Sequence, residues 1–226
     1  MRRLPLFALL ASSILVGACA TSRTAAPPSV TSEQARLAWE AFRGRARGLG
    51  RVELLFDASV TRRGETVSGT ISVADDPGRA LTLQAEGPFG IRMARGVWEE
   101  GRVVVETFGK KSRKVESDPE RFGEAFGVPL SARELSWIFV GLPDDADPDD
   151  IAVSEGIARL TWGQGRLLAD FDLSRDQVVR IVARGSRQVE VRYRDWKGDI
   201  PAGIAARVTS GESAELVLRS VEASPR

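Results

Sequence analysis

The chain is predicted to be mainly β with helices (α+β), built from one curled antiparallel sheet of about eleven or twelve strands. The first observation is that apolar and polar residues alternate with a period of two from Arg51 onward. The second is that turn sequences rich in Gly, Pro and Asp separate the alternating segments. The third is that one helical pattern precedes the strands and two more interrupt them. A sheet of this size with one apolar face must curl, and helices can then plug its open side.

The segment after Val30 is predicted to form an amphipathic helix. Thr31 or Ser32 can cap it, and Gln34 stands at the position that a capping box from Thr31 requires. Apolar residues then recur at helical spacing and form a face for the core. These are Ala35, Ala38, Trp39, Phe42, Ala46 and Leu49.

The alternating segments fall into two series that flank the central helices. The first series comprises 51–60, 66–74, 80–87, 91–95, 102–108 and 110–116. The second comprises 157–163, 166–173, 177–185, 187–196, 203–209 and 213–221. One apolar and one polar face is typical of antiparallel strands that cover a core on one side only.

Two short helices are expected between the series. Asp118 can cap the first, with Pro119 in its first turn. Ser131 can cap the second, with Glu134 at the capping-box position, and Gly141 is expected to end it.

The N-terminus is typical of an exported lipoprotein. Residues 1–18 combine two arginines with an apolar run that is too short to span a bilayer, as in a signal peptide. The sequence then resembles a bacterial lipobox ending at Cys19, which implies cleavage before Cys19 and acylation of that residue. A chance cysteine or a buried thiol is the alternative. Residues 19–31 are interpreted as a flexible tether and 32–226 as one domain.

Composition excludes several function classes. The chain has no histidine, which removes Ser-His-Asp and Cys-His catalysis in their usual forms, and nearly all zinc sites. The acidic segment 144–150 mimics the start of a calcium loop but lacks its glycine and its closing glutamate, so we interpret it as a solvated loop. The net charge of +1 gives no case for nucleic acid. We therefore expect no enzyme, no metal and no cofactor.

A phenylalanine stands at one turn where polar residues are usual. Phe89 lies between Pro88 and Gly90. Either its ring is exposed and contacts a membrane, or the ring folds back on the core. A basic segment also has two possible interpretations, which are contact with anionic headgroups or protection of an edge strand from aggregation. Its residues are Lys110, Lys111, Arg113 and Lys114.

Several motifs together resemble the LolB family of outer-membrane lipoproteins. They are the Pro-Phe-Gly tip (88–90), GVPL (127–130), LSWIFVGLP (135–143) and VRYRDW followed by IPAGI (191–204). The resemblance spans about Arg36 to Val221. Leucine is commoner than Phe89 in that family, and the last strand here lacks the expected tryptophan.

The resemblance implies a half-open β-barrel lidded by helices, with an apolar cavity for acyl chains. It implies a non-catalytic protein that faces the periplasm, is anchored in the outer membrane through acyl chains on Cys19, and touches the membrane with Pro88, Phe89 and Gly90. The expected partners are a periplasmic lipoprotein carrier and lipoprotein acyl chains, and we expect a monomer. The inward-facing residues that would line the cavity are Leu54, Phe56, Ile71, Val73, Leu81, Leu83, Trp137, Phe139 and Tyr193.

A second hypothesis uses the same fold differently. The protein would be an envelope-assembly or interaction lipoprotein whose sheet is a docking surface and whose lumen is filled with side chains.

Overall fold

The computed structural model describes residues 30–109, 113–126, 128, 130–143, 146–185 and 187–225. The expected signal peptide (1–18), Cys19 and all of the expected tether except its last two residues lie outside this range. No helix within the described residues is long and apolar enough to cross a membrane.

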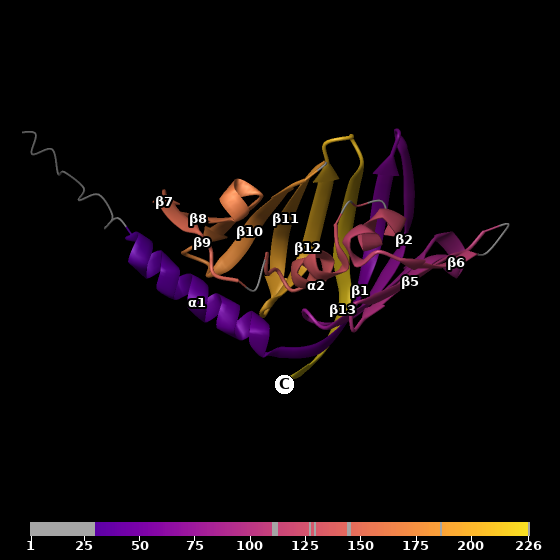
Figure 1. Ribbon diagram of the computed structural model, residues 1–226, viewed down its shortest axis with the longest axis horizontal. Helices are drawn as coiled ribbons and strands as arrows, with labels where there is room; N and C mark the ends of the chain where they lie inside the picture. Colours follow the sequence, from indigo (N-terminus) through magenta and orange to yellow (C-terminus); the bar gives the residue numbers. More distant parts are fainter. Residues whose placement is uncertain are drawn as a thin grey trace, which may run out of the picture.

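The described strands form one antiparallel sheet of 13 strands in the order β6-β5-β4-β3-β2-β1-β13-β12-β11-β10-β9-β8-β7. The first and last strands pair in the middle, so two meanders are joined along β1 and β13 (Figure 1). The edge strands β6 and β7 do not pair with each other, and the sheet stays open. The prediction of a curled antiparallel sheet is confirmed.

The strand bounds follow the alternating segments closely. In the first meander they are β1 (Leu49–Arg62), β2 (Glu65–Asp76), β3 (Ala80–Glu86), β4 (Arg92–Glu99), β5 (Arg102–Thr107) and β6 (Arg113–Ser117). In the second they are β7 (Asp150–Ser154), β8 (Ile157–Trp162), β9 (Leu167–Asp172), β10 (Gln177–Arg184), β11 (Gln188–Lys197), β12 (Ile200–Val208) and β13 (Ser213–Pro225).

The predicted strand count is too low because β7 was missed. This strand has only five residues and follows the acidic segment directly, so its two large apolar residues, Ile151 and Val153, give a weak alternation. Its pairing with β8 supplies the backbone partners that the sequence pattern does not show.

The N-terminal helix α1 (Ser32–Gly48) begins as predicted. The side chain of Thr31 accepts the backbone N–H of Gln34 at 3.2 Å, and the backbone N–H of Thr31 donates to Gln34 Oε1 at 2.9 Å. The helix lies along the β7 side of the sheet (Figure 1). Its buried Trp39 meets the ring of Phe171 on β9 at a centroid distance of 5.8 Å, edge to face. Aromatic pairs of this kind hold α1 against the second meander.

The first central helix, η2 (Pro119–Phe126), is a 3₁₀ helix instead of an α-helix. Its close approach to the chain that follows depends on Gly123, where a Cβ would lie 2.5 Å from the carbonyl oxygen of Val128. The rings of Phe122 and Phe126 rest directly on Gly96 of β4. A missing side chain in the sheet thus makes room for η2.

The second central helix, α2 (Ala132–Phe139), has both predicted end signals. Ser131 and Glu134 form the capping box. At the other end Gly141 has a φ of +73°, its N–H donates to the Ile138 carbonyl at 3.0 Å, and the Leu142 N–H donates to the Trp137 carbonyl at 2.9 Å. These two bonds are the pattern of a Schellman motif.

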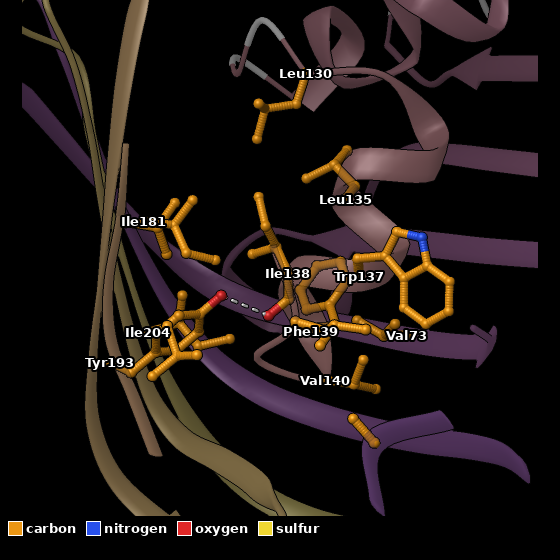
Figure 2. Packing of buried hydrophobic residues seen from close by; sticks show 14 of the residues in the cluster. Val73, Leu130, Leu135, Trp137, Ile138, Phe139, Val140, Ile181, Tyr193 and Ile204 are labelled. Atoms are coloured by element: carbon orange, nitrogen blue, oxygen red, sulfur yellow. Dashed lines mark hydrogen bonds between the residues drawn. The ribbon is translucent and has the colours of Figure 1, made fainter. Parts of the chain in front are cut away.

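Helix α2 is fixed to both meanders. Ser136 Oγ donates to Asp75 Oδ1 of β2 at 2.7 Å and accepts the Gly78 N–H at 2.9 Å. On the opposite side Tyr193 Oη of β11 donates to the Ile138 carbonyl at 3.0 Å, and burial raises the pKa of Tyr193 well above its ordinary value (Figure 2). The helix therefore bridges the two halves of the concave face.

Replacing Ser136 by alanine is expected to lower the free energy of unfolding by about 1–3 kcal/mol, because a buried carboxylate loses a donor. Tyr193→Phe is expected to cost about 1 kcal/mol, since the Ile138 carbonyl keeps the Gly141 N–H as a partner. Urea unfolding of both variants measures the difference. A smaller effect for Ser136→Ala than for Tyr193→Phe would contradict this ranking.

Candidate functional site

The predicted cavity residues come together, but as a packed layer around α2. Eight of the nine are at most 7 % exposed, and Ile71 is partly buried. Phe56 of β1 and Phe139 of α2 place their ring centroids 5.9 Å apart. Figure 2 shows α2 between Val73 on one side and Tyr193 on the other. The middle of the concave face is filled by side chains, and the role of these residues as contacts of an acyl chain stays a prediction.

An open groove lies on the same face, beyond α2 toward the tip that contains Phe89. Its volume is about 730 Å³, and of the predicted cavity residues only Ile71 lines it. We call it the apolar groove. Its apolar lining consists of Ala58, Val60, Val67, Ile71, Ala85, Met93, Ala94, Ala125 and Phe126.

The apolar groove exists because inward-facing residues become smaller along the strands. On β1 the inward residues run from Leu54 and Phe56 to Ala58, and on β3 from Leu81 and Leu83 to Ala85. On β2 the corresponding position is Gly69, where a Cβ would lie 2.0 Å from the carbonyl oxygen of Glu86. Large side chains fill the space near α2, and small ones leave it open near the tip. This gradient in side-chain size is present in the sequence, but the pattern of polar and apolar residues alone does not reveal it.

A strand irregularity adds a further side chain to the apolar groove. The pairing of β3 with β4 shifts between Ala85↔Ala94 and Glu86↔Arg92, which leaves Met93 without a partner on β3. Such a bulge re-aims the extra residue. Met93 lines the apolar groove and is 46 % exposed.

The tip beside the apolar groove is a short 3₁₀ turn, η1 (Pro88–Gly90). Phe89 is 100 % exposed, so its ring projects into solvent and does not fold back on the core. Its φ of +63° is left-handed, a conformation that costs a residue with a side chain about 1–2 kcal/mol. A bulky residue that is both strained and exposed is a sign of function rather than of stability.

Phe89 does not stand alone. Ile91, Met93 and Val67 are 64 %, 46 % and 45 % exposed, and two of them line the apolar groove. We call Val67, Phe89, Ile91 and Met93 the apolar tip. Most other large apolar side chains among the described residues are buried, so this cluster marks an interaction surface.

The basic segment beside this end is described only in part. Lys110 and Lys111 lie outside the described residues, whereas Arg113 and Lys114 are exposed on the edge strand β6. Lys114 forms an ion pair with Glu106 of β5 at 3.3 Å. No group of three or more His, Cys, Asp and Glu residues that could hold a metal ion occurs within the described part of the chain.

Neither a protein-family model nor a curated protein matches the sequence. Solved structures do match. A DUF1329 family protein from Desulfovibrio piger has a TM-score of 0.57 at 10 % identity, over 86 % of this chain and 94 % of the other. A LolA superfamily protein from Nitrosomonas europaea has a TM-score of 0.55 at 8 % identity, over 83 % and 94 %.

The chain therefore has a fold similar to that of this LolA superfamily protein. A putative outer-membrane lipoprotein-sorting protein domain from Vibrio parahaemolyticus shares it, with a TM-score of 0.54 at 10 % identity over 86 % of this chain and 94 % of the other. At these identities the likeness concerns the fold alone.

Proposed function

We propose that the protein is a non-catalytic, lipid-anchored outer-membrane protein that receives lipoproteins from a periplasmic carrier and inserts them into the outer membrane. The observation that carries this proposal is the apolar groove of about 730 Å³ directly beside the exposed Phe89. The LolB-like motifs of the sequence and the LolA-like fold support it. Cys19 is the proposed anchor.

The geometry suggests how a handover would proceed without covalent chemistry. Each CH₂ group of an acyl chain gains about 0.8 kcal/mol when it leaves water, in the groove or in the bilayer alike. The acyl chain therefore needs a continuous apolar path from the groove to the bilayer. Val67 and Met93 belong both to the apolar groove and to the apolar tip, and they supply that path.

A charge on the wall of the apolar groove tests the first step. Val67→Glu is expected to weaken binding of a fluorescent fatty acid about tenfold or more, because an acyl chain would have to desolvate the carboxylate. Val217→Glu is the matched control, since Val217 is also exposed (55 %) but does not line the groove. Equal losses in both variants, or none in either, would argue against the groove as the acyl site.

The docking hypothesis keeps one observation in its favour, namely that side chains of α2 fill the centre of the concave face. An assembly or interaction lipoprotein would need no acyl site. If the full chain binds no fatty acid, and if its depletion leaves lipoproteins correctly localised, this second function replaces the first.

A further inference from the structure

A second hollow lies on the other side of α2 from the apolar groove, among β8 to β11. We call it the second cleft. It has a volume of about 950 Å³ and lies between the start of α2 and the turns that follow β8 and β10. The groove belongs to β1 to β5, which lie across α2 from β9 and β10 (Figure 1). The two hollows share no lining residue.

One wall of the second cleft carries two adjacent arginines. The backbone N–H of Arg184 donates to the carbonyl of Arg166 at 2.7 Å, so the two residues lie side by side at the ends of β9 and β10. Both line the cleft and both are exposed. Neither side chain has an ion pair or a hydrogen bond with any residue that the structure describes. Like charges placed side by side across strands repel.

The outer face of the same strands shows the opposite arrangement. Arg159 pairs with Asp170 at 2.8 Å, Arg180 with Asp170 at 3.1 Å, and Arg192 with Glu190 at 2.7 Å. Arg192 and Arg180 lower the pKa of Glu190, and the hydrogen bond from Arg192 has the largest effect. Arginine is thus neutralised on the solvated outer face, whereas Arg166 and Arg184 at the second cleft have no counter-ion among the described residues.

Carboxylates also line the second cleft, but most of them have partners elsewhere. Glu134 accepts the backbone N–H of Ser131 in the cap of α2. Asp147 forms an ion pair with Arg43, and Asp149 accepts the Gln164 N–H at 3.4 Å. Arg187 is a third arginine near this wall, and it forms an ion pair with Glu212 at 3.6 Å. The β9–β10 wall therefore presents two positive charges, on Arg166 and Arg184, that no residue within the described ranges balances by an ion pair.

The floor of the second cleft is apolar. Leu167 and Ala183, which directly follow and precede the two arginines in sequence, are partly exposed in it, with Leu130 and Val189 beneath. An inorganic anion would use the wall alone. A ligand that fits both wall and floor has an anionic head and an apolar tail.

We propose that the second cleft binds an anionic phospholipid, with its phosphate on Arg166 and Arg184 and the start of an acyl chain on Leu167 and Ala183. The planar forks of two guanidinium groups match phosphate oxygens in bidentate fashion. The volume falls in the range of about 300–1,000 Å³ that small-ligand sites occupy. This site is separate from the proposed acyl site in the apolar groove.

The test is a calorimetric titration of the full chain, in a non-ionic detergent, with dihexanoyl phosphatidylglycerol. Arg166→Gln combined with Arg184→Gln is expected to weaken binding at least about tenfold. Arg113→Gln combined with Arg207→Gln removes the same charge from exposed positions outside the cleft and is expected to leave binding unchanged. Thermal unfolding checks that both double variants stay folded.

Two further arms identify the ligand and its place. Inorganic phosphate and dihexanoyl phosphatidylcholine are each expected to bind at least about tenfold more weakly than phosphatidylglycerol. Phosphate that binds as tightly as the lipid would overturn the lipid assignment, and equal affinity for phosphatidylcholine would overturn the anionic preference. Val67→Glu is expected to bind phosphatidylglycerol normally. If Val67→Glu lost this binding while the double arginine variant kept it, the lipid would have to be placed in the apolar groove instead.

Discussion

Phe89→Glu is expected to slow insertion of lipoproteins into membranes strongly while leaving acyl-chain binding in the apolar groove intact. Phe89 is fully exposed and does not line the groove, so the substitution leaves the groove unchanged. Transfer of a phenylalanine side chain out of water gains about 1.5–3 kcal/mol, and a glutamate at the same place would oppose entry into the bilayer. We expect the insertion rate to fall at least about tenfold. A reconstituted transfer assay from carrier to liposome measures it.

Three control variants separate the ring from its surroundings. Phe89→Leu is expected to retain insertion, because it keeps an apolar side chain at the tip. Phe89→Gly is expected to lose insertion yet raise stability by about 1–2 kcal/mol, since glycine relieves the left-handed φ of +63°. Leu37→Glu places the same charge on an exposed apolar position of α1 and is expected to have no effect. Normal insertion by Phe89→Glu would overturn the role of the apolar tip.

Gly141→Ala is expected to lower the free energy of unfolding by about 2–4 kcal/mol. Gly141 ends α2 with a φ of +73°, and a Cβ there would lie 2.3 Å from the Trp196 ring and 3.1 Å from Pro201. The substitution therefore combines a strained backbone with a collision between α2 and the β11–β12 hairpin. Urea unfolding followed by circular dichroism measures the loss.

Gly156→Ala is the matched control for this prediction. Its φ of +78° is nearly the same, but a Cβ there would meet nothing within 4 Å. We expect a cost of only about 1–2 kcal/mol, which is the backbone contribution alone. If the two variants lost equal stability, the contact between Gly141 and Trp196 would not contribute to the packing of α2.

Local signals in the sequence predicted the helices and most strands. The capping residues Thr31 and Ser131 satisfy backbone groups three residues away, so their effect is visible over a few positions. Period-two alternation works equally well when one face of the sheet is buried. The edge strand β7 was not predicted because its five residues carry too few alternations. The packing of η2 against Gly96 was not visible either, because Gly96 lies on a strand distant in sequence.

The candidate site was predicted less completely. A phenylalanine between Pro88 and Gly90 was visible as an anomaly, and the structure places its ring in solvent. An apolar cavity was expected, but the position of the apolar groove was not. The groove depends on small residues such as Ala58 and Gly69, which polarity patterns do not distinguish from other inward positions. The adjacent pair Arg166 and Arg184 was missed as well, since the residues come from different strands and only the pairing of β9 with β10 joins them.

The sequence by itself determined the chain of antiparallel strands, the ends of the capped helices and the apolar turn at Phe89, because each depends on neighbours a few residues apart. Only the tertiary structure decided that α2 fills the centre of the concave face, that hollows remain on both sides of it, and that Phe89 stands beside one of them. Volume is the reason. Whether a space is filled depends on side-chain sizes from strands far apart in the chain, and those sizes meet only when the sheet curls.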